Sequence, residues 1–178
     1  FDKFDMSKAP MFDVEYIFLN IRAKSVGEIS TVNLRCLDDN ETFVKTEIDL
    51  TEVEVKMDEE HTNKIELTEE MGMIMTYPNL DSFADYDVTN INASNMIDMI
   101  ASCIAQIYDK KGEDVYDSKD STHKELVDFI EQLNSKQFAD VQKFFDTMPK
   151  LTHTVTIENP KTKKKSEIVL SGLNDFFV

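Results

Sequence analysis

Residues 11–28, MFDVEYIFLNIRAKSVGE, hold the strongest structural signal in the first half of the chain. Apolar residues at the spacing i, i+3, i+4, i+7 predict a helix with one apolar face. In this stretch they are Val14, Ile17, Phe18 and Ile21. We expect a helix over about residues 12–24 that ends at Gly27, because glycine commonly terminates helices. Its apolar face is expected to form the floor of a core.

The period of the apolar residues changes from about 3.6 to 2 after this helix, which predicts β-strands. We expect the strands at residues 29–36, 43–48, 53–57, 65–67 and 71–77. Thirteen acidic residues and three lysines lie between residues 38 and 70. Residues 11–78 are therefore expected to form a helix followed by an acidic, mostly antiparallel sheet.

Helical patterns return after Pro78. A weak helix is expected at about residues 80–86. A longer helix is expected to begin at Ser94 or Asn95, with an apolar side that extends to Tyr108.

Two more helices have clear start signals. Thr122 and Glu125 have the spacing of a capping box, which predicts a helix through Leu133. Ser135 is expected to cap the next helix, which Pro149 ends. The apolar stripe of this last helix is Phe138, Val141, Phe144, Phe145 and Met148.

The last segment, residues 151–178, predicts a β-hairpin around a lysine-rich turn. The fold class is therefore α+β: an acidic sheet region, a section of three or four helices over residues 79–150, and a C-terminal hairpin. We expect these sections to form a single compact unit over residues 1–178. Since the chain starts with Phe1, we also expect an N-terminal portion to precede it.

The formal net charge of −16 constrains the partners. Nucleic-acid backbones and anionic membranes would be repelled by such a protein, so neither is expected as a partner. The cysteines, Cys36 and Cys103, are expected to be buried thiols in a reducing compartment. Four lysines lie at 161 and 163–165. A solvated turn is the favoured interpretation, with docking onto an acidic protein patch or a phosphate as the alternatives.

No constellation of residues predicts catalysis or cofactor binding. The histidines His61, His123 and His153 are isolated in sequence, and Cys103 is expected within a helix on its apolar side. Asp81, Asp85 and Asp87 suit a solvated acidic loop better than a weak cation site. We expect no enzyme activity, no cofactor and no metal site.

The chain ends are the candidate partner-binding residues. Apolar residues at a terminus either tuck into the domain or anchor a partner. Both alternatives stay open for Phe176, Phe177 and Val178. Phe1 and Phe4 are expected to be covered, by the N-terminal portion that precedes them or by a partner.

Four segments carry a family resemblance: FDVEYIFLNIRAKSVGE at 12–28, GMIMTYP at 72–78, FFDTMPKL at 144–151 and LSGLNDFF at 170–177. In order and spacing they are similar to the baseplate hub and hub-assembly proteins of T4-like contractile-tailed bacteriophages. The resemblance spans nearly the whole chain, and the first and last segments are the most specific.

This resemblance implies a phage protein made in the host cytoplasm that acts in assembly of the central hub of the tail baseplate. It would be a chaperone-like factor or a hub component, and its partners would be other hub proteins. Whether it forms a homo-oligomer and whether it stays in the virion tail are left open. Some relatives carry paired cysteines that suggest a metal knuckle. Here Cys36 stands alone and the last hairpin has no cysteine, so metal binding is not carried over.

A rival hypothesis follows from the charge alone. An acidic decoy could mimic nucleic acid and bind a host nucleic-acid-binding protein. A decoy needs regularly spaced acids along a surface, whereas an ordinary solvated sheet face also explains the acids found here.

Overall fold

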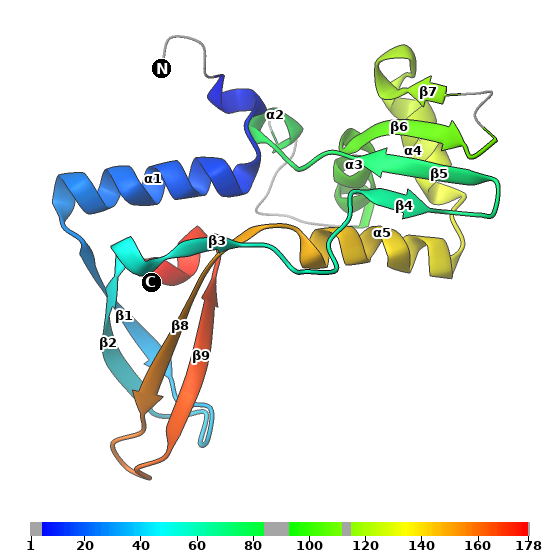
Figure 1. The fold of residues 1–178 in the computed structure, drawn as a ribbon. Helices are drawn as coiled ribbons and strands as arrows, with labels where there is room; N and C mark the ends of the chain where they lie inside the picture. The colour runs from blue at the N-terminus through cyan, green and yellow to red at the C-terminus, as the bar shows by residue number, and fades with distance from the viewer. Residues whose placement is uncertain (1–4, 84–92, 112–114, 178) are drawn as a thin grey trace. The chain divides into compact units, whose positions relative to one another are not determined.

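The computed structural model describes residues 5–83, 93–111 and 115–177 (Figure 1). It contains helices and antiparallel sheets, so the predicted α+β class is confirmed. The chain forms two compact units, each made of two separate stretches. Unit 1 is Phe1–Met11 with Asp58–Met148, and unit 2 is Phe12–Met57 with Pro149–Val178. The expectation of one unit over residues 1–178 stays a prediction.

Unit 2 combines one long helix with two antiparallel sheets. Strands β1 and β2 form a hairpin, and β3, β8 and β9 form the second sheet in the order β3-β8-β9. The predicted C-terminal hairpin is thereby confirmed, and α1 lies across one end of the sheets (Figure 1). The elements are α1 (Met11–Val26), β1 (Ile29–Arg35), β2 (Phe43–Asp49), η2 (Leu50–Glu52), β3 (Glu54–Lys56), β8 (Lys150–Glu158), β9 (Lys165–Ser171) and η4 (Leu173–Phe176).

The core of unit 2 forms where α1, both sheets and η4 meet. Its fully buried members are Leu19, Val32, Cys36, Ile48, Leu50, Leu151 and Phe176. In β1 the inward side begins at Ser30, whose hydroxyl donates to the carbonyl of Phe176. Ile29, the first residue of β1, is 52% exposed.

The helix predicted at residues 12–24 is confirmed, but its predicted core face is wrong. The buried residues of α1 are Leu19 and Ala23, on the opposite side from the predicted face. Phe18 is 53% exposed and Ile21 59% exposed. Both sides of this helix carry apolar residues, and periodicity alone does not determine which of them packs on the sheets.

Unit 1 is a four-stranded antiparallel sheet, in the order β4-β5-β6-β7, with helices packed on one face. The buried core includes Met73 and Met75 from the sheet, Ile100 from α3, Ile130 from α4, and Phe144 from α5. The elements are η1 (Met6–Lys8), β4 (Lys64–Glu66), β5 (Met71–Met75), α2 (Leu80–Phe83), α3 (Ala93–Ser102), β6 (Ile104–Asp109), β7 (Val115–Asp117), η3 (Ser118–Asp120), α4 (His123–Glu131) and α5 (Ser135–Thr147).

The helix predicted to extend to Tyr108 is wrong in its second half. It ends at Ser102, and residues 104–109 form β6, which pairs with β5 on one side and β7 on the other. Ile104, Ile107 and Tyr108 also have the spacing of one helix face, and the sequence pattern does not show which strands pair with this segment. Cys103 therefore lies in a buried turn and not within a helix.

The last two helices agree with their sequence signals. Thr122 and Glu125 form the predicted capping box of α4. The cap of α5 is Asn134 and not Ser135, because the Asn134 side chain accepts hydrogen bonds from the first turn and Gln137 completes the box. Phe138, Val141, Phe144 and Phe145 belong to the core as predicted.

One glycine of unit 1 is required by a close approach. A Cβ atom on Gly72 would overlap the phenol ring of Tyr108, its partner across β5 and β6. The ammonium of Lys64 lies 5.0 Å from the centroid of the same ring. The ring therefore covers the bare backbone of Gly72 on the face opposite the helices.

Candidate functional site

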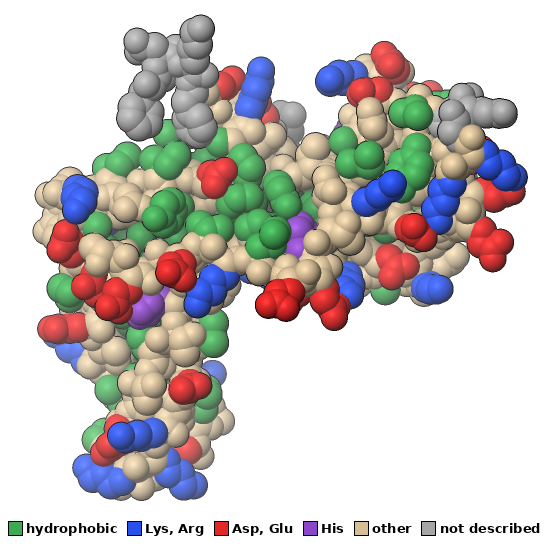
Figure 2. Space-filling view, viewed as in Figure 1, with side chains coloured by type: hydrophobic (Ala, Val, Ile, Leu, Met, Phe, Trp, Pro, Cys, Tyr) green, Lys and Arg blue, Asp and Glu red, His purple; other side chains and the backbone are tan. Residues whose placement is uncertain are grey.

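Four large apolar side chains lie together on one side of α1. Val14 and Ile17 are half-buried, while Phe18 and Ile21 are more than half exposed. We call these four residues the α1 stripe. Hydrophobic side chains gather visibly along α1 in Figure 2. An apolar stripe on the outside of a folded unit is typical of a surface that binds another protein.

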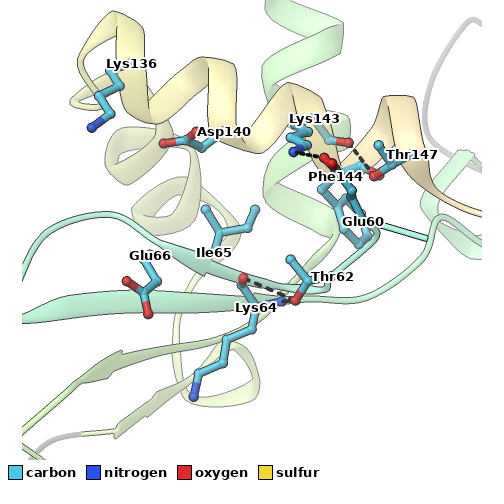
Figure 3. Close-up of a pocket in the computed structure, with 10 residues that line it drawn as sticks. All are labelled: Glu60, Thr62, Lys64, Ile65, Glu66, Lys136, Asp140, Lys143, Phe144 and Thr147. Carbon is cyan, nitrogen blue, oxygen red and sulfur yellow. Dashed lines mark hydrogen bonds and ion pairs between the residues drawn. The ribbon is translucent and has the colours of Figure 1, made fainter. Parts of the chain in front are cut away.

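Unit 1 has a groove between β4 and α5 (Figure 3). It encloses about 380 Å³, and Ile65 and Phe144 lie at its floor. Charged residues of both signs surround it, namely Glu60, Lys64, Glu66, Lys136, Asp140 and Lys143. The carboxylate of Glu60 accepts a hydrogen bond of 2.8 Å from Lys143, and this contact raises the pKa of that ammonium. Three acidic and three basic side chains therefore line the groove, so its charge is balanced.

The free edge of β4 in this groove is short. Antiparallel pairing alternates, so the N–H and C=O of Lys64 and Glu66 point away from β5. The Thr62 hydroxyl accepts from the N–H of Lys64 at 3.1 Å and contacts its carbonyl at 3.4 Å. This side-chain cap shortens the edge that another strand could use.

His61 connects three segments of unit 1. Its Nδ1 lies 2.9 Å from the Thr147 hydroxyl and its Nε2 lies 2.9 Å from the Tyr77 hydroxyl. The Thr147 hydroxyl donates to the carbonyl of Lys143, so it accepts from Nδ1–H, and Nε2 then accepts from Tyr77. Burial lowers the pKa of His61. With both nitrogens engaged, the neutral ring has a structural role.

The turn of the C-terminal hairpin is held by a buried side chain. Asn159 is 1% exposed, and its amide donates to Asp38 at 2.9 Å and to Asp39 at 3.0 Å. The pKa of Asp38 is lowered by hydrogen bonds from Thr162 and Asn159. The four lysines of this turn are exposed, as the solvated-turn interpretation predicts. In the described part of the chain, no group of three or more potential metal ligands comes together.

The terminal residues that were predicted to bind a partner differ in their burial. Phe176 is fully buried in the core of unit 2, so it tucks into the domain and does not offer a surface to a partner. Phe177 is 37% exposed, and its ring centroid lies 5.7 Å from the guanidinium carbon of Arg22. The remaining candidates, Phe1, Phe4 and Val178, lie outside the described residues, as do Asp85 and Asp87.

Sequence reasoning missed the α1 stripe because it assigned these residues to the core. A signal was present: Leu19 and Ala23 form a second apolar pair on the other side of the helix. A helix with two apolar sides has more apolar surface than one sheet contact covers.

None of the helices in the described ranges is both long and apolar enough to cross a membrane. A family model described as T4 bacteriophage base plate protein matches residues 1–178. No curated protein and no solved structure matches the chain. The match covers the full sequence, including the four segments on which the resemblance was based. The chain belongs to the T4 bacteriophage base plate protein family.

Proposed function

We propose that the protein acts in assembly of the central hub of the phage baseplate, as a chaperone-like factor or as a hub component. Membership of the baseplate family supports association with other baseplate proteins in the phage tail. It also favours this function over the acidic decoy. The observation that carries the proposal is the α1 stripe, with Phe18 and Ile21 more than half exposed on a well-formed helix.

The mechanism is non-covalent. The α1 stripe covers an apolar surface of a hub protein in the host cytoplasm, and the next hub component displaces it. Burying apolar surface stabilises such a contact by about 25 cal/mol per Å² before the costs of association. The α1 stripe is one side of a single helix, so its contact with a hub protein is small enough for a later partner to replace it.

We also propose that the protein is not an enzyme. Both cysteines are buried, and burial raises the pKa of Cys103 to about 12, which disfavours the nucleophilic thiolate. The His61 nitrogens are occupied by structural hydrogen bonds.

Co-expression with the hub proteins of the same phage tests the proposal. We expect one of them to elute with this protein in size-exclusion chromatography, and we expect Ile21→Asp to abolish the complex. Val169→Asp is the matched control, because Val169 and Ile21 are both 59% exposed in unit 2. Absence of any complex with every hub protein, or loss of the complex in the control alone, would contradict the proposal.

A further inference from the structure

We propose that, in the free protein, a second copy of the chain covers the α1 stripe, with the two α1 helices antiparallel about a two-fold axis. The inference rests on the proposed function, since it concerns the same surface before a hub protein reaches it. It identifies the occupant of the stripe when no other partner is present.

The stripe is self-complementary about its middle. Val14 and Ile21 mark its ends, and Ile17 and Phe18 lie at the centre. A two-fold axis near the centre places each end against the opposite end of the other copy, so that the same patch serves both protomers. Residues at this spacing form ridges that pack into the grooves of a neighbouring helix.

Charge selects the antiparallel direction. Asp13 and Lys24 are eleven residues apart, which is about three helical turns, so they share one flank of the stripe near its two ends. Antiparallel pairing brings Asp13 of one copy beside Lys24 of the other, twice per dimer. Parallel pairing about a two-fold axis would instead place this flank of the two copies on opposite sides of the contact, so Asp13 and Lys24 would not pair with each other.

The existing contacts of these residues leave them available. Asp13 is exposed, and Lys24 has an exposed ion pair of 3.2 Å with Glu28. Exposed pairs of this kind contribute little, so exchange for a partner carboxylate costs little. Elsewhere on α1, the side chains of Asn20 and Ser25 donate to carbonyls of their own helix at 2.9 and 2.7 Å, so these donors are already satisfied beside an apolar contact.

Opposing effects set the strength of the pairing. Each chain carries −16, and this general repulsion works against association. One helix pair also buries less than a standard protein interface. We therefore expect a dissociation constant in the micromolar range or weaker, which allows a hub protein to displace the second copy.

Sedimentation equilibrium over a concentration series, with the full chain, tests the inference. We expect a monomer–dimer equilibrium in the wild type and only monomer for Ile21→Asp. Val169→Asp should dimerise like the wild type. Circular dichroism shows whether each variant is folded.

A charge swap tests the direction. Asp13→Lys and Lys24→Glu each place two like-charge pairs in the dimer, and each should weaken it roughly tenfold. The double variant Asp13→Lys/Lys24→Glu restores opposite charges and should recover most of the wild-type association. This recovery is specific to antiparallel self-pairing.

Three results would overturn the inference: a wild type that stays monomeric throughout, an Ile21→Asp variant that still dimerises, or a double variant weaker than both single variants. Failure here is separate from failure of the proposed function. A monomeric protein that binds a hub protein through Ile21 would refute the dimer alone, whereas a dimer without any hub complex would refute the proposed function alone.

Discussion

Helices α5 and α1 use their apolar residues differently. In α5 the apolar side chains gather on one side, and that side is the core of unit 1. In α1 only Leu19 and Ala23 are buried, while Phe18 and Ile21 face outward. A helix that only packs against its own core needs one apolar face. A helix with a second apolar face has apolar surface available for a partner.

The largest effect is expected for Phe144→Ala in α5. The Phe144 ring is 2% exposed and lies 5.3 Å from the His61 ring and 5.6 Å from the Tyr77 ring, measured between centroids. Removing it should lower the free energy of unfolding by about 3–5 kcal/mol. Chemical denaturation measures this loss, and a loss below that of an exposed substitution would contradict the core assignment of α5.

Leu19→Ala tests the buried side of α1. Leu19 is fully buried, so we expect a loss of about 2–5 kcal/mol in the same measurement. The matched control is Ile21→Ala, on the opposite side of the same helix. If the two variants were equally stable, α1 would not have one packed and one free side.

Asn134→Ala removes the cap of α5. Its side chain accepts from the N–H groups of Lys136 and Gln137 at 3.0 and 3.1 Å. Loss of this cap should cost about 1 kcal/mol. Asn134→Ser should retain most of the stability in thermal unfolding, because serine also caps helices. A serine variant no better than alanine would argue against the cap.

Acidification should lower the free energy of unfolding because His61 becomes protonated. The pKa of His61 in the folded state is lowered from its ordinary 6.5, mainly by burial. The unfolded chain therefore binds the proton first, so the stabilisation is complete above pH 6.5 and is lost as the pH falls through the folded pKa. We expect His61→Gln to flatten the stability profile below this pH. If the variant lost stability with falling pH as steeply as the wild type, groups other than His61 would cause the pH dependence.

The smallest effect is expected for Ile21→Ala. Because Ile21 is 59% exposed, its truncation should change the free energy of unfolding by no more than about 0.5 kcal/mol. A loss of several kcal/mol would show that Ile21 is packed in the core and that the α1 stripe is not an exposed surface.

Local signals predicted α4 and α5 well, because the capping residues and a single apolar stripe agree with each other. They failed where the answer depends on distant segments. Residues 104–109 became a strand because β5 and β7 lie on either side of them. The pairing of β3 with β8, which joins the two separate stretches of unit 2, is also long-range and has no local sequence signal.

Only the type of the candidate binding surface was predictable from the sequence. The sequence indicated exposed apolar residues for a partner, yet it placed them at the termini. Phe176 lies in the core, in the short helix η4, whereas Phe18 and Ile21 of α1 are exposed. Which of two apolar helix sides meets the sheets depends on the packing of Leu19 and Ala23, and the helical period does not record it.

Thermal unfolding of Ile21→Asp tests the central claim most directly, with Leu19→Asp as the comparison. The two substitutions place the same charge on opposite sides of α1. We expect Ile21→Asp to melt cooperatively within about 3 °C of the wild type and Leu19→Asp to be largely unfolded. If Ile21→Asp unfolded as Leu19→Asp does, the α1 stripe would be core and not a surface for partners.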